Sequence, residues 1–233
     1  MPSSPALVGT LIESALGRPA VVVDALESVP GFVDLVLRVP APRGGWQPGH
    51  EMQFRVTPRD GRRYTVLTVD EREPERITLL IAPDTGGPGA AWVRRHDRGS
   101  RMTAIAGSYV PIRQHGVRRL YLGDSSALGT IAALARNADT VVAIEAPSAA
   151  IPALANRWPE YWFVPAREEP GDALQRWLER ALDTGDIIDI DGAVLLGHAQ
   201  SLQNQRAALL AHRVVDRKAI TTRPYWANGR RGL

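Results

Sequence analysis

Residues 51–69 read EMQFRVTPRDGRRYTVLTV and carry the clearest fold signal in the chain. Two strand-like runs, 51–56 and 62–69, flank a segment that ends in Asp60-Gly61. An Asp-Gly pair between two such runs favours a tight turn between antiparallel strands. We therefore predict a β-hairpin at this point of the chain.

The hairpin belongs to a series of short strand-like runs in the first half of the sequence. Proline and glycine separate these runs, for example at Pro30-Gly31 and Pro48-Gly49. Runs at such close spacing predict a six-stranded antiparallel barrel, with a helix over residues 88–97 between the fifth and sixth strands. The six predicted strands are 20–26, 32–39, 51–56, 62–69, 76–82 and 101–106.

The second half of the sequence alternates between strand-like and helix-like segments. This alternation predicts a doubly wound parallel sheet with helices on both faces. We place the boundary so that residues 1–116 form the barrel domain and residues 117–233 form the α/β domain. The predicted strands are 120–122, 140–145, 161–164, 193–196 and 218–222; the predicted helices are 127–136, 149–156, 172–182 and 201–212.

The composition is that of an ordinary globular protein. Of the 233 residues 44% are hydrophobic and 23% are charged. No apolar run approaches the roughly 20 residues that span a bilayer, so we expect no membrane span. The chain has no cysteine and its start lacks signal-peptide features, which favours a cytoplasmic location. The net charge is +3, and the sequence has no basic run interleaved with aromatic residues that would indicate nucleic-acid binding. The oligomeric state stays open.

Two nearby segments carry groups that suit a flavin dinucleotide. Arg62, Tyr64 and Thr65 offer a cation, an aromatic plane and a hydroxyl on one strand, and residues 62 and 64 share a face of it. A flavin ring favours an aromatic face, and its diphosphate needs cations or amides. Downstream, Gly86-Gly87-Pro88-Gly89-Ala90-Ala91-Trp92 is a glycine turn that opens a helix, whose N-terminus attracts phosphate. The alternative is an ordinary exposed strand face.

A second candidate site follows the first strand of the α/β domain. Ligands of open α/β sheets bind outside the carboxyl ends of the strands, where Gly123-Asp124-Ser125-Ser126 lies. We expect Asp124 and Ser126 to take part in cofactor binding; the alternative is a plain turn in which Asp124 or a serine caps the next helix. His198 follows a later strand, where a satisfied rim residue is the simpler interpretation. The five histidines show no metal-ligand spacing, and no catalytic side chain is assigned.

Four motifs in order resemble those of a known family. They are Arg62-x-Tyr64-Thr65, Gly87-Pro88-Gly89-Ala90-Ala91-Trp92, Leu122-Gly123-Asp124-Ser125-Ser126-Ala127-Leu128 and Tyr225-Trp226-x-x-Gly229-Arg230. The chain resembles, over nearly its whole length, the siderophore-interacting proteins. These are FAD-binding ferric-siderophore reductases of the ferredoxin-reductase-like superfamily.

The resemblance implies an FAD-binding barrel followed by an NAD(P)H-binding-like domain. FAD would place its ring against Tyr64 and Thr65 and its phosphates near Arg62, with the turn from Gly87 to Trp92 around the pyrophosphate. Electrons from NAD(P)H or another donor would pass to ferric iron in a siderophore, which would release Fe(II). Tyr225, Trp226 and Arg230 would take part in substrate binding, although the aromatic pair has the alternative role of packing the sheet edge.

The chain departs from the family pattern at several positions. Leu67 stands where an arginine is usual, Ala90 where a serine is usual, and His198 where a glutamate is usual. These departures motivate a second hypothesis, a divergent non-catalytic siderophore-binding or accessory protein of the same fold. A third hypothesis is a flavin reductase that acts on another substrate.

Overall fold

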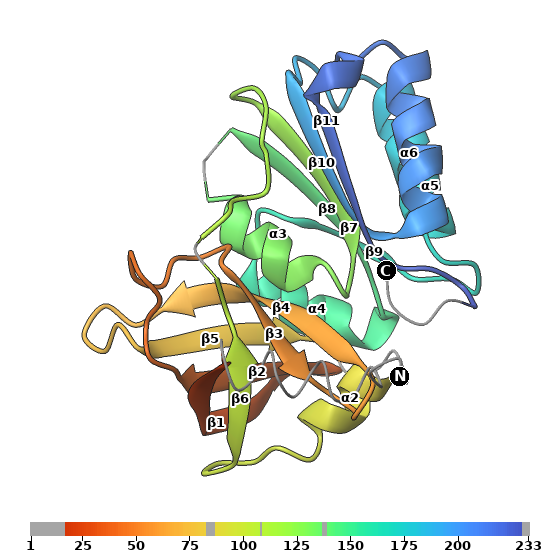
Figure 1. The fold of residues 1–233 in the computed structure, drawn as a ribbon. Helices are drawn as coiled ribbons and strands as arrows, with labels where there is room; N and C mark the ends of the chain where they lie inside the picture. Colours follow the sequence, from red (N-terminus) through yellow and green to blue (C-terminus); the bar gives the residue numbers. More distant parts are fainter. Residues whose placement is uncertain (1–16, 83–86, 108, 137–138, 230–233) are drawn as a thin grey trace, which may run out of the picture. The chain divides into compact units, whose positions relative to one another are not determined.

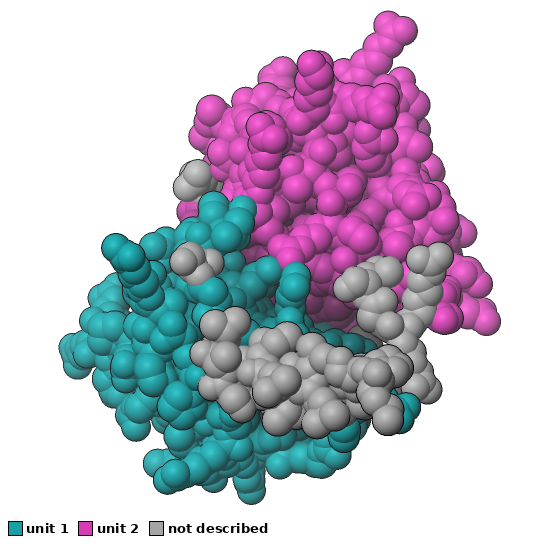
Figure 2. Space-filling view, in the orientation of Figure 1, with its two compact units in different colours: residues 1–111 teal, residues 112–233 magenta. Residues whose placement is uncertain are grey.

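The computed structural model describes residues 17–82, 87–107, 109–136 and 139–229. It divides into two compact units, residues 1–111 and 112–233 (Figure 2). The division lies a few residues before the boundary that we placed at 116, within the segment that leads to the first strand of the second unit.

The first unit is a closed barrel, which confirms the predicted six-stranded antiparallel fold (Figure 1). Every neighbouring pair of strands is antiparallel, in the order β1-β2-β5-β4-β3-β6. The predicted hairpin is the β3–β4 pair. The strands are β1 (Gly17–Val29), β2 (Phe32–Arg38), β3 (Glu51–Arg55), β4 (Gly61–Val69), β5 (Arg76–Ile81) and β6 (Arg101–Ile105).

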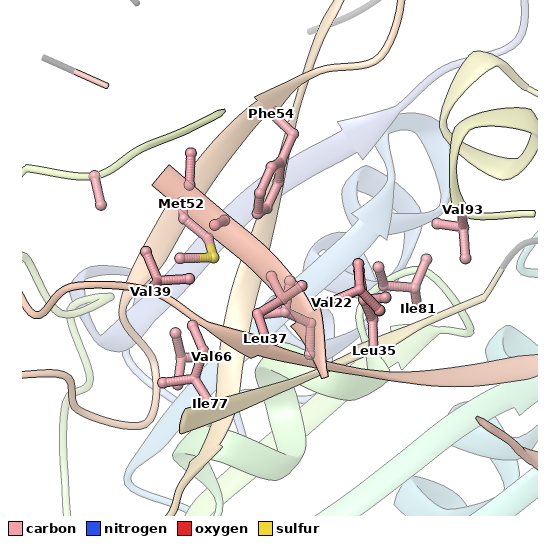
Figure 3. Close-up of a cluster of buried hydrophobic side chains, with 14 of the residues drawn as sticks. Val22, Leu35, Leu37, Val39, Met52, Phe54, Val66, Ile77, Ile81 and Val93 are labelled. Atoms are coloured by element: carbon pink, nitrogen blue, oxygen red, sulfur yellow. The ribbon is translucent and has the colours of Figure 1, made fainter. Parts of the chain in front are cut away.

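Alternating side chains fill the barrel, because successive residues of a strand point to opposite faces. In β3 the buried Met52 and Phe54 alternate with half-buried polar neighbours. Full burial of an apolar side chain of this size contributes about 1.5–3 kcal/mol. Figure 3 shows the resulting core, in which β2, β3, β4 and β5 all contribute, together with Val93 of helix α2 (Pro88–Val93). Trp92 of the same helix is also buried in this core.

Helix α2 is shorter than the helix predicted over residues 88–97. It ends at Val93 because the carbonyl of Trp92 is taken by other donors. The His96 ring donates from Nδ1 to that carbonyl at 2.6 Å, and the backbone N–H of Arg95 reaches it at 3.2 Å in a tighter turn. Such contacts satisfy carbonyls that a helix end leaves unpaired.

The second unit confirms the predicted doubly wound parallel sheet (Figure 1). Its five strands are parallel in the order β11-β10-β7-β8-β9. The strands are β7 (Arg119–Asp124), β8 (Thr140–Ala146), β9 (Trp162–Pro165), β10 (Gly192–His198) and β11 (Ile220–Trp226). The helices are α3 (Leu128–Leu134), α4 (Ile151–Arg157), α5 (Asp172–Asp183) and α6 (Ala199–Ala211), with short 3-10 turns η2 (Ser148–Ala150) and η3 (Arg217–Ala219).

The strand order fixes which helices cover which face. The chain runs outward from β7 to β9, then returns to β10 on the other side of β7. Right-handed crossovers therefore place α3 and α4 on one face and α5 and α6 on the other, as Figure 1 shows. The direction of winding reverses between β7 and β10. In open α/β sheets the carboxyl ends of the strands at such a point border the ligand site.

Strand β11 extends beyond the end predicted at residue 222, while Lys218 belongs to a 3-10 turn instead of the strand. Pro224 does not interrupt β11, since β11 is an edge strand and its outer side needs no ladder hydrogen bond. Tyr225 and Trp226 therefore lie within the strand. Across the described residues, no helix is both long and apolar enough to cross a membrane.

Candidate functional site

The barrel places Arg62 and Tyr64 on its inner side. In the β3–β4 ladder Arg62 lies opposite Phe54, and Tyr64 lies opposite Met52. Directly opposite residues share a face, and both partners belong to the buried core. Arg63 points to the other face and is exposed. The predicted common face of residues 62 and 64 is therefore present.

Gly89 brings the two predicted segments together. A Cβ atom at position 89 would lie 2.6 Å from the Tyr64 hydroxyl and 3.5 Å from Cγ of Arg62. Real Cβ atoms do not approach other atoms as closely as the first of these distances. The absence of a side chain at Gly89 thus lets the cation and the phenol lie over the first turn of α2.

We call the place where Arg62 and Tyr64 meet Gly89 of α2 the barrel corner. The groups that meet there are hydrogen-bond donors. Burial raises the pKa of Tyr64 to about 12 although the nearby Arg62 opposes the shift, so the phenol keeps its proton at neutral pH. Arg62 donates from Nη1 to the carbonyl of Gly61 at 2.8 Å, and no other described residue accepts a hydrogen bond from its remaining N–H groups. Helix α2 begins at Gly87 and Pro88 without a capping side chain and without an acidic residue in its first turn. A cation, a phenol and backbone amides at one place suit a diphosphate.

The aromatic part of the corner is already partly covered. The rings of Tyr64 and Trp92 stack with centroids 5.9 Å apart and planes at 14°, and Phe54 lies against the same tyrosine at 6.2 Å. Only the remaining surface of Tyr64 is open to a flavin ring. Thr65 is 8% exposed and lies opposite Glu51.

The two departures from the family pattern in this unit are both buried. Leu67 lies at an irregularity in the β4–β5 ladder and is 4% exposed, and Ala90 in α2 is also 4% exposed. Ala91, the next residue of α2, is exposed. Both positions are therefore shielded from solvent.

In the second unit, Asp124 ties together the carboxyl ends of three strands. Its Oδ1 accepts from the backbone N–H of Ser126 at 2.9 Å and from the hydroxyl of the same residue at 2.5 Å. Its Oδ2 accepts from the N–H of His198 and from the indole of Trp226, both at 2.9 Å. The alternative in which Asp124 or a serine caps the next helix is wrong, since Ala127 is the N-cap of α3 and no side chain bonds there. The carboxylate instead holds β7, β10 and β11 together.

We call the meeting of β7, β10 and β11 at this carboxylate the Asp124 junction. Two glycines allow the strands to come this close. A Cβ atom at Gly123 would lie 2.9 Å from the backbone oxygen of Leu196, so a side chain there would push β7 and β10 apart. Gly197 has a φ of 126°, a conformation that side chains disfavour, and a Cβ atom there would clash with the Asp124 carboxylate.

Glu145 and His198 are buried beside this junction, with exposed fractions of 5% and 7%. Glu145 accepts from the N–H of Gly171 at 2.8 Å and of Leu174 at 2.9 Å, so its carboxylate covers the N-terminus of α5. Ser201 donates its hydroxyl to the carbonyl of Pro170, so the 2.8 Å contact from His198 Nδ1 to Ser201 is a donation by the ring. The indole of Trp226 packs on this ring at 4.4 Å.

Sequence reasoning missed Glu145 and Ser201. An acidic residue about twenty positions after the first strand is a signal in dinucleotide-binding sheets, and it would have singled out Glu145. Ser201 carries no such signal, because its role depends on how α6 approaches the loop before α5. The space left between these side chains is only about 30 Å³.

The remaining predicted site residues lie as follows. Tyr225 donates its hydroxyl to Thr130 at 3.0 Å, so both aromatic residues of the last strand contact their own unit. Arg230 and Gly86 lie outside the described residues. Within the described ranges no group of three or more His, Asp or Glu side chains could hold a metal ion.

Comparison with known proteins supports the architecture. No protein-family model matches the sequence, and no curated protein matches it. The structure of a siderophore-interacting protein from Acinetobacter baumannii is similar, with a TM-score of 0.71 and 14% identity over 91% of each chain. The siderophore-interacting protein SipS from Aeromonas hydrophila has a TM-score of 0.68 and 17% identity, over 93% of this chain and 94% of its own.

The chain has the fold of the siderophore-interacting proteins. The same fold occurs in phthalate dioxygenase reductase, a modular protein for electron transfer from pyridine nucleotides to a 2Fe–2S centre. That structure matches with a TM-score of 0.68 and 11% identity, over 94% of this chain and 71% of its own. The predicted ferredoxin-reductase-like architecture is thus confirmed at the level of the fold.

Proposed function

We propose that the protein is an FAD-dependent oxidoreductase that reduces ferric siderophores. The observation that carries this proposal is the approach of Arg62 and Tyr64 to Gly89, inside a barrel of the kind found in siderophore-interacting proteins. The chain's reductase-like fold supports a pyridine nucleotide or another reduced carrier as the electron donor. A cytoplasmic location agrees with a chain that has no cysteine.

The residues at the barrel corner have distinct roles in this proposal. Arg62, the Tyr64 hydroxyl and the amides of Gly89 and Ala90 would hold the diphosphate of FAD, and the open surface of Tyr64 with Thr65 would flank its ring. Gly87, Pro88, Ala91 and Trp92 shape the turn that presents these amides. Bound FAD supplies redox chemistry that amino-acid side chains lack, since it takes up electron pairs and passes electrons on.

The siderophore is the substrate that carries the iron. Ferric iron is held by hard oxygen ligands, and its reduction to Fe(II) weakens that hold, so the protein itself needs no metal ligands. Tyr225, Trp226 and Arg230 are the proposed substrate contacts. Asp124 and Ser126 are the proposed cofactor-binding residues of the second unit. Because both Asp124 oxygens accept hydrogen bonds from their own chain, these residues would shape the end of the sheet that borders the cofactor.

The test compares Arg62→Ala with Arg63→Ala in equilibrium titrations with FAD. Loss of a charge-assisted hydrogen bond costs about 1.5–3 kcal/mol. Arg62→Ala should therefore weaken FAD binding about tenfold to a hundredfold. Arg63→Ala should bind FAD like the unaltered protein, because Arg63 is exposed on the opposite face. Equal losses in the two variants would contradict the assignment of Arg62.

The reaction itself is tested with the FAD-loaded protein. NADH or NADPH should bleach the flavin absorbance, and a ferric siderophore should restore it while an Fe(II) chelator develops colour. If saturating FAD does not bind, the enzyme proposal fails. If the flavin is reduced but reoxidised only by other oxidants, the protein is a flavin reductase of another substrate.

One observation favours the second candidate, a binding or accessory protein of the same fold. Both oxygens of Asp124 and both oxygens of Glu145 accept hydrogen bonds from inside the unit, so these carboxylates already serve the fold. Calorimetry on protein stripped of flavin distinguishes the candidates. A ferric siderophore that binds without FAD, together with no flavin reduction, would support the accessory role.

A further inference from the structure

The second unit contains a larger cavity beside the Asp124 junction. Its volume is about 610 Å³, within the range of small-molecule sites. It lies between the first turn of α5, the first half of α6 and the residues that follow β11. These helices follow β9 and β10, so the cavity lies beyond the carboxyl ends of the strands, where open α/β sheets bind ligands.

The lining of this cavity is acidic and rich in amides. Glu169 and Asp172 contribute carboxylates, and Gln200, Gln203 and Asn204 of α6 contribute amides. None of the described residues that line it is arginine or lysine. The guanidinium of Arg176, one turn along α5, is already paired with Asp172 at 3.0 Å. Carboxylates and amides bind hydroxyl groups of a ligand, whereas the negative charge of the carboxylates repels a phosphate monoester.

The opposite end of the cavity is the start of α6. This helix of 13 residues begins at Ala199 without a capping side chain and without an acidic residue in its first turn. His198 lines the same place and is 7% exposed. Its Nδ1 bonds Ser201, whereas its Nε2 has no hydrogen-bond partner among the described residues. The N-terminus of α5, by contrast, is already covered by the Glu145 carboxylate.

We propose that this cavity takes the adenosine half of a dinucleotide donor without a 2′-phosphate, which makes NADH the donor instead of NADPH. This inference rests on the proposed oxidoreductase function and specifies its donor. Glu169 and Asp172 bind the ribose hydroxyls, since a carboxylate suits a free 2′-hydroxyl whereas an arginine is needed for a 2′-phosphate. The diphosphate lies toward the start of α6, and Nε2 of His198, whose Nδ1 carries the ring proton, accepts from a sugar hydroxyl.

The test is calorimetry of NAD⁺ and NADP⁺ binding to the full chain, with and without added FAD. NAD⁺ should bind at least tenfold more tightly than NADP⁺ in both series, a difference of about 1.4 kcal/mol. Equal affinities, tighter binding of NADP⁺, or no binding of either dinucleotide would overturn the inference.

A charge reversal isolates the role of the cavity wall. Glu169→Arg should raise the affinity for NADP⁺ and reduce the preference for NAD⁺ at least about threefold. Glu168→Arg is the matched control: the same charge change, on the neighbouring exposed residue that does not line the cavity, should leave the preference intact. Equal responses of the two variants would overturn the assignment.

The failure of this inference differs from failure of the proposed function. If FAD does not bind but the preference for NAD⁺ remains, the redox proposal fails and the donor site stands. If FAD binds and is reduced but NADP⁺ binds as well as NAD⁺, only the donor inference fails.

Discussion

The corner of the barrel at Gly89 and the junction at Asp124 use polar groups in opposite ways. At Gly89, donors converge: a guanidinium, a phenol and helix amides with no carboxylate in the first turn of α2. At Asp124, a carboxylate converges with donors from its own chain, and both of its oxygens are occupied. The first arrangement leaves hydrogen-bonding capacity for an anionic ligand. The arrangement at Asp124 stabilises the sheet, and the cavity that could hold a ligand lies beside this carboxylate.

Removing the carboxylate of Asp124 should have the largest effect on stability. Asp124→Ala leaves the N–H of His198 and the indole of Trp226 without acceptors, and each such loss costs about 1–3 kcal/mol. We expect the free energy of unfolding of the second unit to fall by about 3 kcal/mol, measured by urea denaturation. Ser126→Ala, which removes one hydroxyl bond to the same carboxylate, should cost about 1 kcal/mol. Equal effects would show that the junction is not stabilised through Asp124.

Alkaline pH should affect both units, because each buries a tyrosine. Burial raises the pKa of Tyr64 and of Tyr161 to about 12, whereas an unfolded tyrosine ionises near about pH 10. Between these values the unfolded state has lost a proton that the folded state keeps, so stability falls as pH rises, by up to about 2.7 kcal/mol for each tyrosine.

Denaturation at a series of alkaline pH values measures this loss, and ultraviolet absorbance follows tyrosinate formation. Tyr64→Phe should remove the part of the pH dependence that belongs to the barrel, and Tyr161→Phe the part that belongs to the second unit. A pH dependence unchanged in both variants would contradict the burial of these phenols.

Neutralising Glu145 should have a smaller effect. Glu145→Gln keeps one acceptor oxygen for the N-terminus of α5, but it replaces the second with a donor and removes the charge from the helix dipole. We expect a loss of about 1.5–2 kcal/mol in the free energy of unfolding. Glu179→Gln on the exposed side of α5 is the control and should change stability by less than about 0.5 kcal/mol.

The smallest predicted effect concerns the fit at Gly89. Gly89→Ala places a methyl group against the Tyr64 hydroxyl, which must shift away from the turn, and FAD binding should weaken about tenfold, or about 1.4 kcal/mol. Gly87→Ala is the matched control, since a Cβ atom there meets nothing within 4 Å. Titration with FAD measures both affinities. If the two alanines have the same effect, the close approach to Gly89 does not matter for binding.

Most of the fold could be predicted because its signals are local. Proline and glycine separate the strands of the barrel, and the alternation of segments after residue 117 reflects a parallel sheet. The helix and strand ends that were predicted wrongly depend on contacts with residues outside the segment itself. The ring of His96 ends α2, and β11 continues through Pro224 only because that strand lies at the sheet edge.

The candidate site could be predicted only where the alternation of side chains along a strand determines which residues lie together. Residues 62 and 64 share a face in any strand, and the glycine turn is visible in the sequence. The meeting of Tyr64 with Gly89 requires the closed barrel, and the junction of Asp124, His198 and Trp226 requires the strand order. Ser201 and Glu169 gain their roles from the packing of α5 and α6, which no local pattern contains.

The strand order also has a consequence for the folding pathway. The central strand β7 pairs on one side with β10, and the hydrogen bond from His198 to Asp124 joins residues 74 positions apart. Long-range pairing of parallel strands is slow, because chain entropy is lost before the contacts form. During synthesis β7, β8 and β9 emerge first, so one edge of β7 stays open until the wholly buried strand β10 arrives. We expect this interval to be the point at which the chain is most exposed to aggregation.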